Sequence, residues 1–511
     1  MFSQILKELL TWQSLLGLLI GVVGGMVIGA LPGLSATMGV ALMIPISYGM
    51  DAVPALIMLS SVYTTATYGG SITAILLHTP GTPSSAATAL DGYELTKQGK
   101  GLQAIGMSTI SSMVGGVFSA VMLLLLAPPL ARVSLKFSAP EFFLIAVFGL
   151  TIIASLAGEN MIKGLFAGAF GLVICCIGTD KVNAYPRFCF GNLHLESGIA
   201  MVPALIGMFS ISQVMHQAEM LRKGMISEVK KVDTSELLKG KMLFPAREYI
   251  KYIPNFIRSA IVGLLVGILP GAGGDTGSWL AYNEAKRASK NKDQFGHGSF
   301  EGICASETAN NAVTGGSYIP LLTLGVPGSS VAAVLMGGLL LHGMQPGSDL
   351  FTKKAVTTYA IIIGFLVANL MMGLIGLKIG KYIAKVAEVP MYVLAPIIVC
   401  LSVLGSYAIN RSMFDVLIMF IFGIVGYLFR KLQIPTAPVI LAMILGPMAE
   451  GNLYRTTIMC KGDFWGYLFS RPLSIALGIL TIVALIAPFI RSFLTRNIKT
   501  DGGEEAINQD D

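Results

Sequence analysis

Four Pro-Gly pairs, each set in an apolar segment, mark the positions at which this sequence could bind a solute. They are Pro32-Gly33, Pro80-Gly81, Pro270-Gly271 and Pro327-Gly328. Proline cannot donate a hydrogen bond to the preceding turn and glycine accepts unusual backbone angles, so each pair is expected to end a helix. The hydroxyl-bearing residues that follow are good N-caps for a new half-helix. Its N-terminus offers free N–H groups and a positive dipole end, which can bind a carboxylate without a buried Lys or Arg.

These pairs recur in the same order in the two halves of the chain. The stretch G-A-L-P-G-L-S-A-T-M-G at Gly29–Gly39 returns as G-I-L-P-G-A-G-G-D-T-G at Gly267–Gly277, and G-G-S and a second Pro-Gly pair follow each copy. One Pro-Gly pair is best explained as a kink in a membrane helix, but matched interruptions in two halves indicate a secondary transporter's binding site. The substrate-binding residues predicted on this basis are Pro32, Gly33, Ser35, Thr37, Gly70, Ser71, Pro80, Gly81, Thr82, Ser84, Ser85, Gly271, Asn310, Asn311, Gly316, Ser317, Pro327, Gly328, Ser329 and Ser330.

Two acids in the second half are candidates for binding a cation. Asp275 follows the Gly-rich break, where its carboxylate could bind a cation together with exposed carbonyl groups or simply cap the next helix. Glu307 lies one turn before Asn311 on the same helical face, and the spacing of the two G-G-S motifs aligns these residues with Ser61 and Thr65. An interhelical hydrogen-bond network is the alternative for this face. The predicted cation-binding residues are Gly273, Gly274, Asp275, Thr276 and Glu307.

An enzyme is not expected from this sequence. The five histidines form neither H-x-x-x-H nor H-E-x-x-H, the phosphate-binding G-x-x-x-x-G-K-[ST] pattern is missing, and the six cysteines show no C-x-x-C spacing. We therefore expect no cofactor and no metal other than a transported cation. The net charge of +7 needs no nucleic-acid partner to explain it.

The composition is that of a membrane protein. Hydrophobic residues make up 54% of the 511-residue chain and charged residues 12%, too few to cover the surface of a soluble protein of this length. Apolar runs long enough to cross a bilayer recur along the chain, and we expect ten to twelve spans together with re-entrant pieces. The predicted fold is an all-α polytopic membrane protein.

The domain organisation follows from the distribution of charge. We expect a first membrane repeat at residues 1–216, a cytoplasmic basic connecting loop at 217–258, a second membrane repeat with C-terminal helices at 259–497 and a polar tail at 498–511. Basic clusters flank the second L-P-G segment, whereas the segment after the first has none near it. By the positive-inside rule the two copies open to opposite faces, which predicts two inverted structural repeats with re-entrant hairpins and broken helices.

With these motifs assembled, the chain resembles the large membrane subunit of the tripartite tricarboxylate transporters (TctA-like proteins). The resemblance covers nearly the whole chain and is most specific at Gly29–Thr37, at Y-G-G-S-I-T-A-I-L-L-H-T-P-G-T-P-S-S-A-A-T-A-L-D-G-Y (Tyr68–Tyr93), at Gly267–Gly274 and at E-T-A-N-N-A (Glu307–Ala312).

The resemblance implies uptake of a citrate-like tricarboxylate or related carboxylate across the bacterial inner membrane, with sodium as the coupling ion. It implies two protein partners, a small four-helix membrane subunit (TctB-like) and a periplasmic solute-binding protein (TctC-like), and kinship with elevator-type transporters. A subunit of a dicarboxylate binding-protein-dependent transporter and an anion channel are the alternatives.

Overall fold

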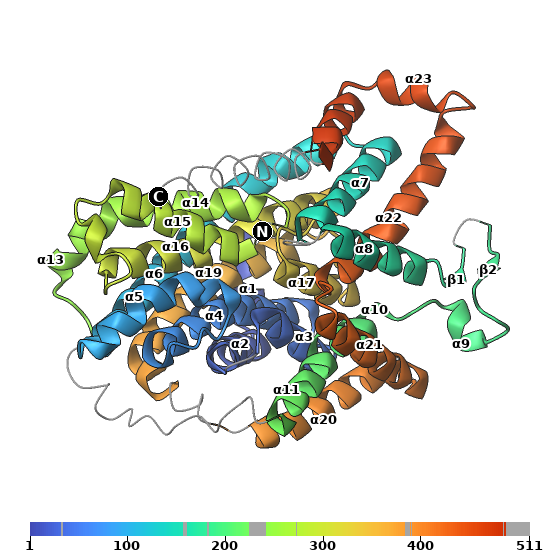
Figure 1. Cartoon of the computed structure of the whole chain (residues 1–511). Helices are drawn as coiled ribbons and strands as arrows, with labels where there is room; N and C mark the ends of the chain where they lie inside the picture. Colours follow the sequence, from blue (N-terminus) through green and yellow to red (C-terminus); the bar gives the residue numbers. More distant parts are fainter. Residues whose placement is uncertain are drawn as a thin grey trace, which may run out of the picture. The chain divides into compact units, whose positions relative to one another are not determined.

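The structure is a computed structural model that describes residues 1–31, 34–156, 161–180, 183–223, 242–271, 273–383, 389, 391–483 and 485–486. Over these residues the chain is almost entirely helical, and the only strand pairing joins β1 (Gly178–Thr179) to β2 (Pro186–Arg187) (Figure 1). The all-α prediction is therefore confirmed for the described part of the chain. The chain forms two compact units, unit 1 (Met1–Leu135 and Ala200–Leu432) and unit 2 (Lys136–Ile199 and Gln433–Asp511).

Unit 1 contains the helices of both Pro-Gly motifs. Its first segment has α1 (Phe2–Leu9), α2 (Trp12–Ala30), α3 (Ala36–Ser47), α4 (Ala52–Leu77), the 3-10 turn η1 (Pro83–Ser85), α5 (Ala86–Lys97) and α6 (Gly101–Ser134). Its second segment has α10 (Met201–Ile206), the π-helical turn η2 (Gly207–Ile211), α11 (Ser212–Arg222), α13 (Ala246–Tyr249), η3 (Ile250–Tyr252), α14 (Ile253–Ile268), α15 (Gly273–Ala288), η4 (Lys292–Gln294), α16 (Phe300–Leu324), α17 (Ser330–Leu341), α18 (Ser348–Thr352), α19 (Ala355–Ile383), α20 (Met391–Asn410) and α21 (Met413–Lys431).

Helices α4 and α16 form the centre of unit 1. Every residue of α4 from Val53 to Leu76 is buried, and so is every residue of α16 from Gly302 to Thr323. Both helices are rich in Ser, Thr and Gly, and α16 also contains Asn310 and Asn311. A helix that is buried on all sides and polar inside must find hydrogen-bond partners on its neighbours. The centre of unit 1 is therefore built to hold polar groups.

Glycines bring α2 and α14 into backbone contact with these central helices. A β-carbon on Gly21 or Gly29 of α2 would collide with the carbonyl oxygen of Met58 or Ala66 of α4. A β-carbon on Gly267 of α14 would reach the carbonyl oxygen of Val313 of α16 in the same way. Lipid tails are as apolar as the side chains, so the hydrophobic effect does not hold two membrane helices together. Close packing at small residues does so instead.

Six helical segments of the described residues are long and apolar enough to span a membrane. They are Trp12–Ala30, Gly101–Ser134, Ala246–Ile268, Ala355–Ile383, Tyr392–Asn410 and Met413–Lys431. The predicted number of ten to twelve is higher because it counted the apolar parts of α4 and α16, which have 26 and 25 residues but are interrupted by polar side chains. It also counted the run Ile319–Leu341, which the structure divides between the end of α16 and the 12-residue helix α17.

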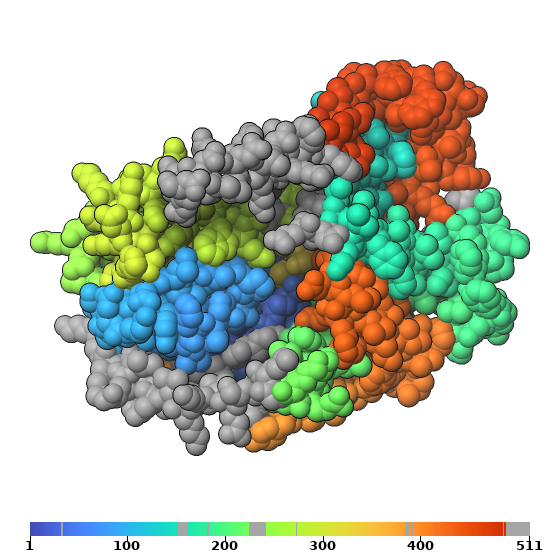
Figure 2. Space-filling view, in the orientation of Figure 1, coloured from blue at the N-terminus to red at the C-terminus, as the bar shows by residue number. Residues whose placement is uncertain are grey.

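A buried carboxylate ties α5 to the turn that joins α15 and α16. Asp91 of α5 is fully buried, and its Oδ1 accepts hydrogen bonds from the backbone N–H groups of Gly296, Gly298 and Ser299 at 2.8–3.0 Å. Its Oδ2 accepts the hydroxyl of Tyr282 at 2.9 Å. On the face shown in Figure 2, the blue surface from the α5–α6 part of the chain borders the yellow-green surface of the α14–α15 part.

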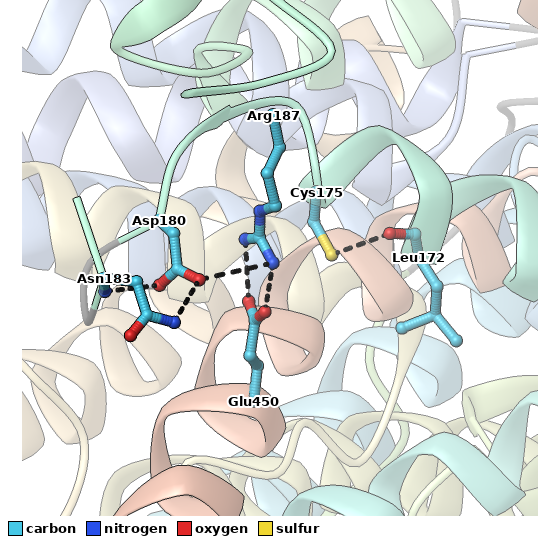
Figure 3. A network of polar contacts seen from close by, with 6 residues as sticks. All are labelled: Leu172, Cys175, Asp180, Asn183, Arg187 and Glu450. Carbon is cyan, nitrogen blue, oxygen red and sulfur yellow. Dashed lines mark hydrogen bonds and ion pairs between the residues drawn. The ribbon is translucent and has the colours of Figure 1, made fainter. Parts of the chain in front are cut away.

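Unit 2 packs α22 (Ala437–Met459) against α7 (Ala139–Leu156) and α8 (Met161–Cys175), and it includes α9 (Leu193–Glu196) and α23 (Phe464–Phe469). Two Arg–Glu pairs stabilise it. The Arg471 guanidinium binds the fully buried carboxylate of Glu141 at 2.6 and 3.0 Å. The Arg187 guanidinium faces both oxygens of Glu450, and its Nη1, which contacts Glu450, is also 3.9 Å from Oδ2 of Asp180 (Figure 3).

The predicted division at residues 216 and 258 stays a prediction, since both compact units draw on both predicted repeats. Residues 224–241 of the basic connecting segment and the whole polar tail (498–511) lie outside the described residues.

Candidate functional site

The second Pro-Gly pair of each half ends a long helix in the same way. Helix α4 ends at Leu77 and α16 at Leu324, and the next residue, His78 or Gly325, has a left-handed backbone with φ of 55° or 73°. The next backbone N–H then donates a hydrogen bond to a carbonyl of the same helix, from Thr79 to Thr73 in α4 and from Val326 to Pro320 in α16. The predicted helix breaks are therefore present at both positions.

The two breaks also pack on their own halves in the same manner. A β-carbon on Gly81 would collide with the carbonyl oxygen of Gly29, and one on Gly328 with that of Gly267. The N–H of Gly271 donates to the Gly328 carbonyl at 3.0 Å, which joins the first break of the second half to its second break. Pro32 and Gly33, predicted for the first half, lie outside the described residues, as does Ala272.

These contacts correct the alignment of the central helices by one residue. Gly69 approaches the carbonyl of Met26 on α2, and its counterpart on α16, next to the Leu264 carbonyl of α14, is Gly316 rather than Gly315. The G-G-S motifs therefore do not superpose letter for letter. Glu307 and Asn311 correspond to Ser60 and Thr64, so the predicted match with Ser61 and Thr65 is wrong.

A polar cluster lies where α4, α16 and α19 meet. The Thr64 hydroxyl is 2.6 Å from Oδ1 of Asn369 and 3.2 Å from Oδ1 of Asn311. All three side chains are fully buried. Asn369 also donates from Nδ2 to the Phe365 carbonyl at 2.8 Å.

Asn310 is the least satisfied polar side chain of this region. It is fully buried, and within the described part of the chain neither its amide oxygen nor its amide nitrogen has a hydrogen-bond partner. A β-carbon placed on Gly274 would lie 2.7 Å from the Asn310 amide oxygen and 3.2 Å from the β-carbon of Ser84. An unsatisfied buried polar group costs about 1–3 kcal/mol, so an amide in this position favours a bound partner.

The predicted hydroxyl groups fall into two sets, one at each second break. Thr82 is 3.2 Å from the Ser84 hydroxyl and 2.9 Å from that of Ser85, and all three are buried. At the other break, Ser329 caps α17 by accepting the N–H of Ala332 at 3.2 Å. Ser35 caps α3 through the N–H of Met38 at 3.3 Å. The predicted N-capping role is thus observed for Ser35 and Ser329.

Contacts across the two halves connect these sets to the opposite half. The Tyr63 hydroxyl of α4 hydrogen-bonds to Ser329 at 2.8 Å, and Thr37 of α3 lies 3.4 Å from the Ser330 hydroxyl. Ser84, for its part, lies beside Gly274 and Asn310 of the second half. Each break of one half is therefore set against the helices of the other. Of the remaining predicted residues, Gly70, Ser71, Gly316, Ser317 and Pro327 are buried at the breaks, and Pro80 is exposed.

The two predicted cation ligands differ in their surroundings. Glu307 is fully buried, and it accepts hydrogen bonds from Thr88 at 2.5 Å and from Ser112 at 3.0 Å. Asp275 and Thr276, in the first turn of α15, are exposed, and Gly273 with φ of +67° precedes them. Glu307 is thus bonded to α5 and α6, whereas the other four predicted residues lie in the Gly-rich turn at the start of α15.

Sequence reasoning missed several of these residues. Thr64, Thr88 and Ser112 could not be distinguished from the many other hydroxyl groups of the chain. Asn369 gave a usable signal, because an amide in the middle of a long apolar segment is expensive unless it is bonded. Tyr63 gave none, since its partner Ser329 is distant in sequence.

Comparison with known proteins agrees with this architecture. The profile of the tripartite tricarboxylate transporter TctA family matches residues 15–441. An uncharacterized 52.8 kDa protein in the TAR-I ttuC' 3' region of Agrobacterium vitis is 35% identical over 487 residues, which are 94% of this chain and 95% of the relative. An uncharacterized protein in the TAR-II ttuC' 3' region of the same organism is 36% identical over 233 residues, 45% of this chain and 96% of that protein. The chain therefore belongs to the tripartite tricarboxylate transporter TctA family.

Proposed function

We propose that this chain is the large transmembrane subunit of a binding-protein-dependent secondary transporter that imports a tricarboxylate or a related carboxylate. Membership of the TctA family supports the transport role. The observation that carries the proposal is the pair of equivalent helix breaks, each packed on its own half through Gly81 or Gly328 and set against the other half. Broken helices inside a membrane protein are tolerated where they line a cavity, and their free N-termini bind anionic groups.

The proposed transport cycle uses two partners and a sodium gradient. A periplasmic TctC-like protein delivers the carboxylate, and a small TctB-like subunit completes the membrane complex. The two halves act as inverted repeats, and one part of the protein carries the loaded site across the bilayer as in elevator-type transporters.

Sodium coupling is supported by the position of Asp275. This acid is in the first turn of α15, next to Gly274 and the unsatisfied Asn310, so its charge opposes an anion bound there. A cation at Asp275 and the Gly-rich turn would remove that repulsion and so make carboxylate binding depend on sodium. Each charge that crosses 100 mV is worth about 2.3 kcal/mol, and a dianion therefore needs more than two sodium ions before the membrane potential favours uptake.

Uptake into proteoliposomes tests this proposal. The chain is reconstituted with its small subunit and loaded binding protein, and [14C]citrate, [14C]malate and [14C]succinate are offered with and without an inward sodium gradient. We expect accumulation of at least one of them above the external concentration, with both sodium and the binding protein required. Downhill flux that needs neither would identify an anion channel instead, and preference for malate or succinate would indicate a dicarboxylate system.

A further inference from the structure

The two second breaks of unit 1 are equivalent in sequence but differ in the side chains around them. Counting from the matched glycines, Asn310 of α16 corresponds to Tyr63 of α4. By the same alignment Gly274 corresponds to Ala36, and Ser84 to Val331. Each exchange puts a larger or more apolar side chain at the break that contains Ser329. We call the surroundings of Ser84 the first tip and those of Ser329 the second tip.

The first tip has free hydrogen-bonding groups. Gly274 lies directly against the Asn310 amide and Ser84, since a β-carbon on it would come within 2.7 Å of the Asn310 amide oxygen. Both polar atoms of the buried Asn310 side chain lack partners among the residues that the structure describes. The 16-residue helix α15 begins at Gly273, so its positive end lies beside this amide.

At the second tip the two serine hydroxyls that follow Pro327-Gly328 have partners. Tyr63, which is 3% exposed, occupies the position equivalent to Asn310 and binds the Ser329 hydroxyl at 2.8 Å. Ser329 also accepts the N–H of Ala332, and Ser330 lies 3.4 Å from Thr37. The hydroxyl groups of Ser329 and Ser330 therefore already face partners in the first half.

Resting on the proposed function, we propose that the substrate carboxylate binds at the first tip only. The Asn310 amide N–H, the Ser84 hydroxyl and the free N–H groups at the start of α15 donate to its oxygens. Tyr63, Ala36 and Val331 occupy the equivalent place at the second tip and hold the two halves together there. The paired breaks thus have unequal tasks, although their backbones are alike.

The test measures [14C]citrate binding to the purified membrane complex by scintillation proximity in sodium-containing buffer, with malate and succinate as competitors. Asn310→Ala should raise the Kd at least tenfold, because it removes a buried donor to a charged group. Asn310→Asp, which keeps the size but replaces the donor by a negative charge, should abolish binding. Tyr63→Phe is the matched control at the equivalent position and should change the Kd less than twofold.

Several results would overturn this assignment. Citrate binding that survives Asn310→Asp, or sodium affinity that increases in that variant, would identify a cation site instead. A Tyr63→Phe variant that loses as much affinity as Asn310→Ala would show that both tips bind the substrate. If the Asn310 variants do not reach the membrane, Ser84→Ala is measured in their place. An unchanged Kd for citrate in that variant would overturn the assignment. A wild-type complex that binds none of the three acids would contradict the proposed function as well. Failure of the proposed function is therefore distinguishable from failure of the assignment to the first tip.

Discussion

Thr64 and Asn311 occupy equivalent positions in the two halves of unit 1, and they lie in hydrogen-bonding distance of each other, 3.2 Å from hydroxyl to amide oxygen. Two copies of a motif bring equivalent residues together only near the axis that relates the copies. A neighbouring contact also joins the two halves, because a β-carbon on Gly116 of α6 would collide with Asn369 of α19. Along the chain, α6 comes after the first tip and α19 after the second. The polar cluster of Thr64, Asn311 and Asn369 therefore lies where the two halves meet.

Replacing Thr64 by Val should destabilise unit 1. The substitution keeps the shape but removes the donor that Asn369 and Asn311 share, and it leaves buried amide oxygens unsatisfied. We expect a loss of about 1–3 kcal/mol. Thermal unfolding of the purified protein, followed by size-exclusion chromatography, measures the change. Thr67→Val is the matched control in the same helix, because that hydroxyl bonds only to the Tyr63 carbonyl one turn away. Equal unfolding temperatures for the two variants would contradict the role given to Thr64.

Asp275→Asn should reduce the sodium dependence of uptake. The exposed carboxylate in the first turn of α15 is the charge that sodium is proposed to neutralise, and the amide removes it at nearly constant size. Uptake rates measured against sodium concentration should lose at least part of their sodium requirement, while the amount of protein in the membrane stays the same. Asp349→Asn, at an exposed ion pair with Lys353, is the control for removing a surface charge. A sodium curve identical to that of the wild type would exclude Asp275 as a ligand.

Gly81→Ala and Gly328→Ala should each prevent the break from packing on its own half. The added β-carbon would overlap the carbonyl oxygen of Gly29 or Gly267, which belongs to backbone and cannot rotate away. Steric conflict of this kind typically costs several kcal/mol, so little folded protein is expected. Gly49→Ala is the control, since no atom lies within 4 Å of its β-carbon position. Membrane abundance by immunoblot and monodispersity in detergent give the readout, and normal levels of either tip variant would argue against the close packing.

The two Arg–Glu pairs of unit 2 should differ strongly in their contribution to stability. Arg471→Ala leaves the fully buried Glu141 carboxylate without its cation, and a loss of about 3–5 kcal/mol is typical of such a change. Arg187→Ala removes an ion pair whose two side chains are 28% and 46% exposed, so water can replace the lost partner. We expect the free energy of unfolding to fall by at most about 1 kcal/mol. Thermal unfolding of both variants at equal ionic strength compares them directly. Equal losses would mean that burial of Glu141 is not the deciding factor.

The helix breaks were predictable because Pro and Gly act locally, and breaks are present at the three Pro-Gly pairs that lie within the described residues. The positions of Ser35 and Ser329 as N-caps follow from the same local chemistry. The one-residue shift between α4 and α16 was not predictable from the G-G-S letters. Packing selects the glycine that lets the backbone of α2 or α14 approach, and this is Gly69 in one half and Gly316 in the other.

The partners of the polar residues could not be derived from the sequence either. Contacts such as Tyr63 with Ser329 or Thr88 with Glu307 join segments more than 200 positions apart, and many hydroxyl groups could have served equally well. Hydropathy does not distinguish a span from another buried helix either, since burial inside protein and burial in lipid favour similar residues. In α4 and α16 the protein, and not the bilayer, surrounds the helix.

The contacts of Asp91 fix the helix that directly follows Ser84 and Ser85. Three hydrogen bonds join α5 to the turn ahead of α16 and a fourth joins it to Tyr282 of α15, and all four end on a fully buried carboxylate. Movement of α5 away from the second half would break these hydrogen bonds and leave the buried carboxylate without its donors, so Asp91 resists separation of the first tip from the second half.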